Sequence, residues 1–140
     1  MSARYFLDTN IFVYSLDVTV PVKARRAATL IRDGLESGNG IVSYQVVQEF
    51  FNVAFRRFAK PMSAYAAEEY LNTTFRSLLV VHSSPALFIS GLQVYAQHHF
   101  SWYDSLIVAA AQEAGCSILY SEDMQRGQRV GDLRIENPFR

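Results

Sequence analysis

The sequence predicts an α/β protein in which a central parallel sheet is covered by helices on both faces. Short apolar runs at 4–7, 40–43, 78–82 and 117–120 have the length and composition of buried strands. Longer segments between them place apolar residues at helical spacing. Because strands and helices alternate along the chain, each strand is expected to run parallel to the next.

The predicted helices begin at residues that favour helix N-termini and end at glycines. Serine hydroxyls accept bonds from the first free N–H groups, proline suits the first turn, and glycine adopts the left-handed backbone that ends a helix. The expected helix starts are Pro21, Ser43, Ser63 and Ser84-Pro85, and the expected stops are Gly38 and Gly115. The tail "DLRIENPF" can add one strand, whereas "AKPMS" and "RGQRVGD" are interpreted as polar loops.

Length and composition indicate an ordinary globular protein. The chain has 140 residues, 50% of them apolar, and we expect residues 1–140 to form one domain. Its 13 basic and 13 acidic side chains give no net charge, which argues against binding nucleic acid by overall charge alone. Cys116 has no partner for an intrachain disulfide. No signal-peptide pattern or long apolar run is present, so the cytoplasm is the expected compartment.

Acidic side chains follow the predicted strands or stand near helix starts. Asp8 directly follows the first strand, and Glu122 and Asp123 follow the strand at 117–120. Glu49 lies in the second turn of the helix after 40–43, and Asp104 begins the helix before 117–120. Ligands bind at the carboxyl ends of strands in open α/β sheets, so these acids should approach one edge of the sheet.

Carboxylates gathered at one place repel one another unless a cation compensates their charge. Oxygen ligands with no Cys or His at metal spacing favour a hard ion, Mg²⁺ or Mn²⁺. Such a site can activate a bound water and stabilise charge on a phosphodiester. The residues therefore favour metal-assisted phosphodiester hydrolysis.

Each acid also has a purely structural interpretation. Asp8 can cap a helix, and Asp104 completes the capping-box pattern "SWYD". Glu49, at the edge of an apolar stripe, can simply be solvated, and Glu122 and Asp123 can be turn residues. A capping carboxylate can still offer an oxygen to a metal, so the two roles are compatible.

Other polar residues are interpreted more simply. Adjacent histidines point in different directions on a helix, so His98 and His99, like His82, are interpreted as surface or helix-end residues and not as zinc ligands. Arg126 and Arg129 follow Asp123 in a glycine-containing loop, where they can hold RNA phosphates or be solvated.

Four stretches together resemble one family. "FLDTNIFVY", "SYQVVQEFFNV", "HHFSWYDSLIVAAAQEAGCSILYSEDM" and "LRIENPF" resemble the PIN-domain family, and among its members the small bacterial VapC-type toxins of toxin–antitoxin pairs. The resemblance spans essentially the whole chain.

The resemblance implies a three-layer α/β/α sandwich and Mg²⁺- or Mn²⁺-dependent endoribonuclease activity. It implies a homodimer and silencing by a VapB-type antitoxin that lies across the active-site groove. It also implies that Asn10 and Ser121 support the acids. The catalytic and metal-binding acids that it implies are Asp8, Glu49, Asp104 and Asp123, with the neighbouring Glu122 as the departure from the pattern.

The leading hypothesis is therefore a metal-dependent endoribonuclease that is the toxin of a type II toxin–antitoxin system. A PIN nuclease for housekeeping RNA processing or for DNA is the alternative within the enzymes. A non-catalytic PIN-like module that binds RNA or a protein is the alternative outside them. A receiver-type phosphoacceptor domain fits less well, because the chain has no lysine after Lys60.

Overall fold

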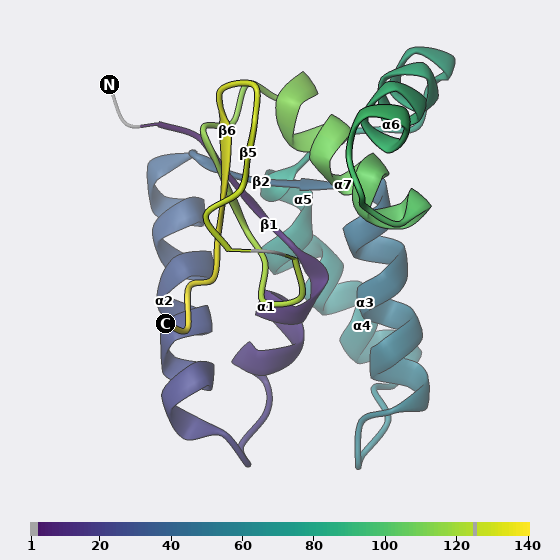
Figure 1. Ribbon diagram of the computed structural model, residues 1–140. Helices are drawn as coiled ribbons and strands as arrows, with labels where there is room; N and C mark the ends of the chain where they lie inside the picture. The colour runs from purple at the N-terminus through teal and green to yellow at the C-terminus, as the bar shows by residue number, and fades with distance from the viewer. Residues whose placement is uncertain (1–2, 125) are drawn as a thin grey trace.

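The computed structural model describes residues 3–124 and 126–140, which form a six-stranded sheet with helices on both sides (Figure 1). The strands are β1 (Tyr5–Leu7), β2 (Gly40–Ser43), β3 (Leu79–Val81), β4 (Ile118–Tyr120), β5 (Arg129–Val130) and β6 (Leu133–Glu136). The helices are α1 (Thr9–Ser15), α2 (Pro21–Ser37), α3 (Tyr44–Arg56), α4 (Ala64–Tyr70), the π-helical turn η1 (Leu71–Phe75), α5 (Arg76–Leu78), α6 (Pro85–Gln97) and α7 (Trp102–Glu113).

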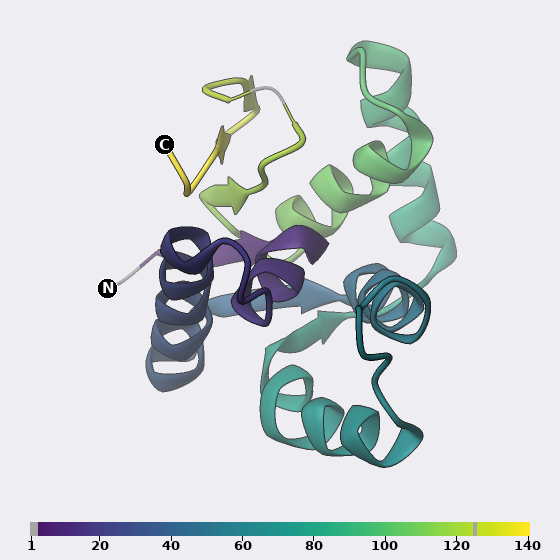
Figure 2. The same ribbon diagram turned by 90° about the horizontal axis from the view of Figure 1, so that it is seen from below.

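The sheet is parallel except at one edge. Its strand order is β3-β2-β1-β4-β6-β5, which runs from bottom to top in Figure 2. The first four neighbouring pairs are parallel, and only β5 pairs with β6 in the antiparallel sense. In Figure 1, α2 lies on one side of the strands and α6 and α7 lie on the other. The predicted α/β class with helices on both faces is confirmed.

Most of the predicted helix boundaries are confirmed. Pro21 begins α2, and Gly38 ends it with a φ of 76°. The hydroxyls of Ser63 and Ser84 accept the expected cap bonds at the starts of α4 and α6. The predicted helix start at Ser43 is confirmed, but without a bond from its side chain. Ser43 occupies the N-cap position of α3, makes no side-chain cap bond, and is also the last, buried residue of β2.

Two segments differ from their predictions. The helix expected after Ser63 is interrupted by η1 and continues to Leu78, so the strand predicted over 78–82 starts at Leu79. The rings of Tyr70 and Phe75, at the two ends of this interruption, both pack on Phe50, with centroids at 4.9 and 5.4 Å. The predicted loop "RGQRVGD" contains β5, which pairs with the tail strand β6.

The carboxyl ends of β1, β2 and β4 lie at one edge of the sheet, called here the carboxyl edge. α1 and α3 start directly after β1 and β2 at this edge. α7 also starts there, because Gln45 in the first turn of α3 donates a hydrogen bond of 3.1 Å to the Tyr103 carbonyl. The starts of α1, α3 and α7 and the segment after β4 therefore lie together at the carboxyl edge.

The longest helix among the described residues is α2, with 17 residues. No helix in the described ranges is both long and apolar enough to cross a membrane.

Candidate active site

Asp8 lies where β1 ends and α1 begins. β1 and β4 are neighbours with Leu7 opposite Tyr120, so Asp8 and Ser121, the residues that follow, meet at the carboxyl edge. The Ser121 hydroxyl donates a hydrogen bond of 2.8 Å to Oδ2 of Asp8. The Thr9 N–H donates one of 2.7 Å to Oδ1, which makes Asp8 the N-cap of α1. Both oxygens of this buried carboxylate are held in place.

The surroundings of Asp8 disfavour its negative charge. The pKa of Asp8 is raised to about 6: burial raises it most, the charges of Glu49 and Asp104 also raise it, and the hydrogen bonds from Thr9 and Ser121 lower it in part. A carboxyl group of this kind is stabilised in its charged form by a nearby cation. The position therefore suits a carboxylate that binds a positive group at neutral pH.

Glu49 faces the same place from α3. The Thr9 hydroxyl donates a hydrogen bond of 3.3 Å to Oε1 of Glu49. Gln45, one turn earlier on the helix, donates a long bond of 3.4 Å to the same oxygen and also bonds the Tyr103 carbonyl. Gln45 is 5% exposed. It joins α3 to the start of α7, a role that the sequence analysis missed although Gln45 stands four positions before Glu49.

Asp104 lies in the first turn of α7. The Ser101 hydroxyl accepts a hydrogen bond of 3.1 Å from the Asp104 N–H, so the capping interpretation of "SWYD" is confirmed for the serine. The Asp104 side chain remains at the carboxyl edge, where burial raises its pKa and the charge of Asp123 raises it further. Burial likewise raises the pKa of Glu49, and the charge of Asp104 adds to that effect. The four predicted acids therefore follow one another along the carboxyl edge in the order Asp8, Glu49, Asp104 and Asp123.

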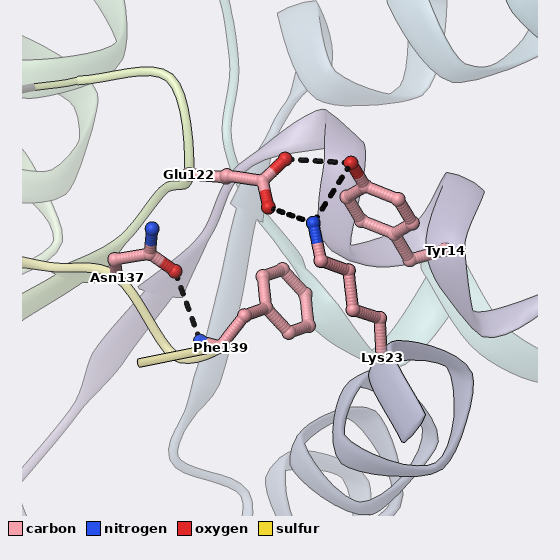
Figure 3. Close-up of polar contacts among 5 residues, drawn as sticks. All are labelled: Tyr14, Lys23, Glu122, Asn137 and Phe139. Carbon is pink, nitrogen blue, oxygen red and sulfur yellow. Dashed lines mark hydrogen bonds and ion pairs between the residues drawn. The ribbon is translucent and has the colours of Figure 1, made fainter. Parts of the chain in front are cut away.

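Glu122, the extra acid, is held by residues outside this series (Figure 3). Its carboxylate accepts hydrogen bonds of 2.6 Å from the Tyr14 hydroxyl and 2.5 Å from the Lys23 ammonium. Lys23 also lies over the rings of Tyr14 and Phe139, at 4.7 and 5.5 Å from their centroids. Burial alone raises the pKa of Glu122, but the bonds from Lys23 and Tyr14 outweigh it and lower the pKa. Glu122 thus anchors the segment next to Asp123 to α1 and α2, and Lys23 contacts Phe139 of the C-terminal tail.

The donor set fits a hard cation held partly through water. All four acids offer carboxylate oxygens, which Mg²⁺ and Mn²⁺ prefer. Within residues 3–124 and 126–140, no group of three or more His, Cys, Asp or Glu side chains is arranged to hold a metal ion. Mg²⁺ commonly binds one or two carboxylates and completes its shell with water and phosphate oxygens. The arrangement fits this mode better than a cage of three protein ligands.

Asn10 and Ser121 were both expected to support the acids. Ser121 does so through its bond to Asp8. Asn10 bonds no acid, and both atoms of its side-chain amide are buried without a hydrogen-bond partner in the described part of the chain. Buried amide groups are normally satisfied by protein or by water. Asn10 therefore has bonding capacity for a water or a ligand near Asp8.

Asp104 and Asp123 line a pocket of about 280 Å³ beside the carboxyl edge. Gln128 lines the same pocket, and it lies between the exposed residues Arg126 and Arg129. The segment that carries these two arginines therefore borders the site.

Sequence comparison identifies the family of the chain. The PIN domain family model matches residues 5–130. A search of curated proteins found no match.

Solved structures give the same fold. The toxin VapC20 of Mycobacterium tuberculosis, described as cleaving the sarcin–ricin loop, is 17% identical, covers 85% of this chain and 89% of its own, and superposes with a TM-score of 0.60. A toxin–antitoxin complex from Klebsiella pneumoniae is 17% identical, with 98% of each chain covered and a TM-score of 0.65. FitAcB from Neisseria gonorrhoeae is 18% identical, covers 96% of this chain and 98% of its own, and has a TM-score of 0.62.

At these identities the solved structures establish a shared fold, and the family match covers most of the chain. The mainly parallel sheet with helices on both faces agrees with the family match. This chain belongs to the PIN-domain family.

Proposed function

We propose that this chain is a metal-dependent endoribonuclease, the toxin of a type II toxin–antitoxin pair, and that residues 1–140 form a single nuclease domain acting in the cytoplasm. One observation carries the proposal. Four acids that are far apart in the sequence gather at the carboxyl edge: Thr9 bonds both Asp8 and Glu49, and Asp104 and Asp123 line one pocket. The family match and the toxins among the similar structures support the class of activity.

The proposed catalytic and metal-binding residues are Asp8, Glu49, Asp104 and Asp123. A bound Mg²⁺ or Mn²⁺ supplies positive charge and lowers the pKa of a water for attack on an RNA phosphodiester.

The contribution of the chain itself is positioning. Ser121 and Thr9 hold Asp8, and Gln45 holds Glu49 against the start of α7. Arg126 and Arg129 are exposed beside the site, where they can contact RNA phosphates.

The test is cleavage of total RNA by purified protein with Mg²⁺, with Mn²⁺ and with EDTA. Asp8→Asn keeps the size of the side chain and should keep the circular dichroism spectrum, yet it should abolish metal-dependent cleavage. Asp132→Asn, the same change at an exposed acid between β5 and β6, is the matched control and should cleave like the wild type. Undiminished cleavage by Asp8→Asn would overturn the proposal.

A non-catalytic module that binds RNA or a protein is the second candidate. It is favoured by one observation, that no three acids among the described residues are arranged to hold a metal ion. Calorimetry with Mn²⁺ separates the two candidates. The nuclease should bind the ion and lose that binding in Asp8→Asn, whereas a module of this kind should show no heat of binding in either protein.

The toxin role and the antitoxin partner are tested in cells. Induced expression of the wild type should arrest growth, and Asp8→Asn should not. Co-expression of the protein encoded by the neighbouring gene should restore growth if that protein is the VapB-type antitoxin. Cleavage in vitro without growth arrest would instead support a housekeeping PIN nuclease.

We also propose a homodimer, supported by an apolar face on α6. Phe88, Ile89, Leu92 and Tyr95 are exposed at helical spacing, with 39% to 57% of each residue accessible. Exposed apolar patches of this kind commonly mark protein interfaces. Leu92→Glu should convert a dimer into a monomer in sedimentation velocity, whereas Tyr65→Glu, at an exposed aromatic on α4, should not. A wild-type monomer would contradict the dimer.

A further inference from the structure

The pocket beside Asp104 and Asp123 is lined by polar residues that the proposed metal site does not use. Its walls come from the end of α6, the α6–α7 connection, the start of α7 and the segment after β4. Besides the two acids it is lined by two histidines, His98 and His99, and two glutamines, Gln97 and Gln128. In the part of the chain that the structure describes, none of these four side chains bonds the acids.

One wall of the pocket is held in a defined orientation. His98 is the C-cap of α6, and its N–H donates a hydrogen bond of 2.9 Å to the Val94 carbonyl. The imidazole of His98 packs against the ring of Phe100, with centroids 5.8 Å apart and planes at 31°. His99, the next residue, is more exposed. A histidine whose ring packs on Phe100 and a more exposed histidine therefore follow one another at the pocket.

The lining indicates the class of ligand. Two carboxylates in the wall disfavour a phosphate group unless a cation lies between them. Imidazole and carboxamide groups hydrogen-bond the edges of unpaired bases, and flat rings stack on their faces. A volume of about 280 Å³ is at the lower end of the range for ligand pockets, which suits one base better than a longer ligand. The chemistry favours an uncharged, planar, polar group.

We propose that this pocket binds one nucleobase of the RNA, next to the phosphodiester to be cleaved, and that His98, His99 and Gln128 determine which base is accepted. The proposal rests on the proposed function, because Asp104 and Asp123 belong both to the pocket and to the candidate metal site. The base would place its adjoining phosphate beside those acids. The side chains around the pocket would then select the cleavage site.

Binding can be measured without cleavage. The chain has three histidines. His82 serves as an internal control, because it follows β3, the outermost strand on the opposite side of the sheet from β5 and β6. In EDTA, the imidazole NMR signals should be followed during titration with ApA, CpC, GpG and UpU in turn. The signals of His98 and His99 should shift most with one dinucleotide, and those of His82 should not. No shift, equal shifts with all four, or the same shifts with ribose 5-phosphate would overturn the proposal.

Selectivity is then measured by sequencing the 5′ ends of RNA cleaved by each variant. His98→Ala should relax the base preference at one position roughly tenfold, mainly through KM, because one stacking or edge contact is lost. His99→Ala, at an exposed and more tolerant position, should do the same if His98→Ala does not fold, and His82→Ala should keep the wild-type pattern. An unchanged pattern in both pocket variants would count against the proposal.

The two experiments separate this inference from the proposed function. If the wild type cleaves no RNA but the dinucleotides still shift His98 and His99, the nuclease proposal fails and base binding stands. If the wild type cleaves RNA with no base preference and the imidazoles do not respond, base binding fails and the nuclease proposal stands.

Discussion

The Ser121 hydroxyl donates a hydrogen bond of 2.8 Å to Oδ2 of Asp8, across 113 positions of sequence. The bond exists because β1 and β4 are adjacent and in register, so that the residues after Leu7 and Tyr120 coincide. It links the two segments that carry the first and last of the proposed site acids. Its strength can be tested directly.

Ser121→Ala should lower the free energy of unfolding of the metal-free protein by about 1–3 kcal/mol at pH 8, because a buried charged oxygen loses its hydrogen bond. Urea denaturation in EDTA measures this. Ser117→Ala, at the opposite end of β4, is the matched control, since the Ser117 hydroxyl makes a long bond of 3.5 Å to the Arg4 carbonyl. Equal losses in the two variants would contradict a special role for the bond to Asp8.

The raised pKa of Asp8 predicts how the stability of the metal-free protein varies with pH. An unfolded aspartate has a pKa of about 3.9, and that of Asp8 in the fold is about 6. The folded state binds this proton more tightly, so the stabilisation is fully present below about pH 4 and is lost as the pH rises through 6. Asp8→Asn lacks this dependence. Its free energy of unfolding relative to the wild type should therefore rise by roughly 2–3 kcal/mol between pH 4 and pH 8.

Urea denaturation in EDTA across this pH range measures the effect, and Asp132→Asn should follow the wild type. Adding Mg²⁺ at pH 8 should raise the melting temperature of the wild type, because a ligand that binds only the folded state stabilises it. Asp8→Asn should respond much less. A pH-independent difference between Asp8→Asn and the wild type would show that Asp8 has no raised pKa.

The contacts of Glu122 predict an indirect effect on the site. Tyr14→Phe removes the hydroxyl that donates a hydrogen bond of 2.6 Å to Glu122, the residue next to Asp123. The free energy of unfolding should fall by up to about 1 kcal/mol. The Mn²⁺ affinity measured by calorimetry should fall a few-fold as Asp123 becomes less well positioned. Tyr65→Phe, at an exposed tyrosine on α4, should change neither quantity. Unchanged Mn²⁺ affinity in Tyr14→Phe would mean that these contacts are structural only.

The contacts of Gln45 predict that a substitution at this residue, which is not one of the four acids, lowers the activity. Gln45→Leu keeps the approximate size of the side chain but removes the bonds to Glu49 and to the Tyr103 carbonyl. Without these two bonds Glu49 and the start of α7 are less well positioned relative to each other, which should reduce kcat/KM for RNA cleavage by about tenfold or more. Gln48→Leu, on the exposed face of the same helix, should remain active. The two variants should be compared at equal folded fractions, established by circular dichroism, and equal activities would exclude this role.

Several features were predictable because they depend on neighbours along the chain. Apolar periodicity identified the strands and helices around the sheet, and Pro21 and Gly38 marked the ends of α2. The place of Asp8 after a strand was sufficient to put it at the carboxyl edge. The same local reasoning missed β5, whose two residues form a strand only because β6 lies alongside. It also missed η1, where Tyr70 and Phe75 pack on Phe50 from a distant helix.

The sequence by itself determined the α/β class, the edge of the sheet at which the acids gather, and their chemical type, because these follow from residue spacing and from the rule that parallel strands end on one side. Only the tertiary structure decided which polar groups serve the acids and which do not. It assigned Glu122 to Lys23 and Tyr14, Gln45 to Glu49, and His98 and His99 to the pocket shared with Asp104 and Asp123. These relationships depend on which strands are neighbours and on how helices pack across the sheet, and neither is encoded in the spacing of residues along one segment.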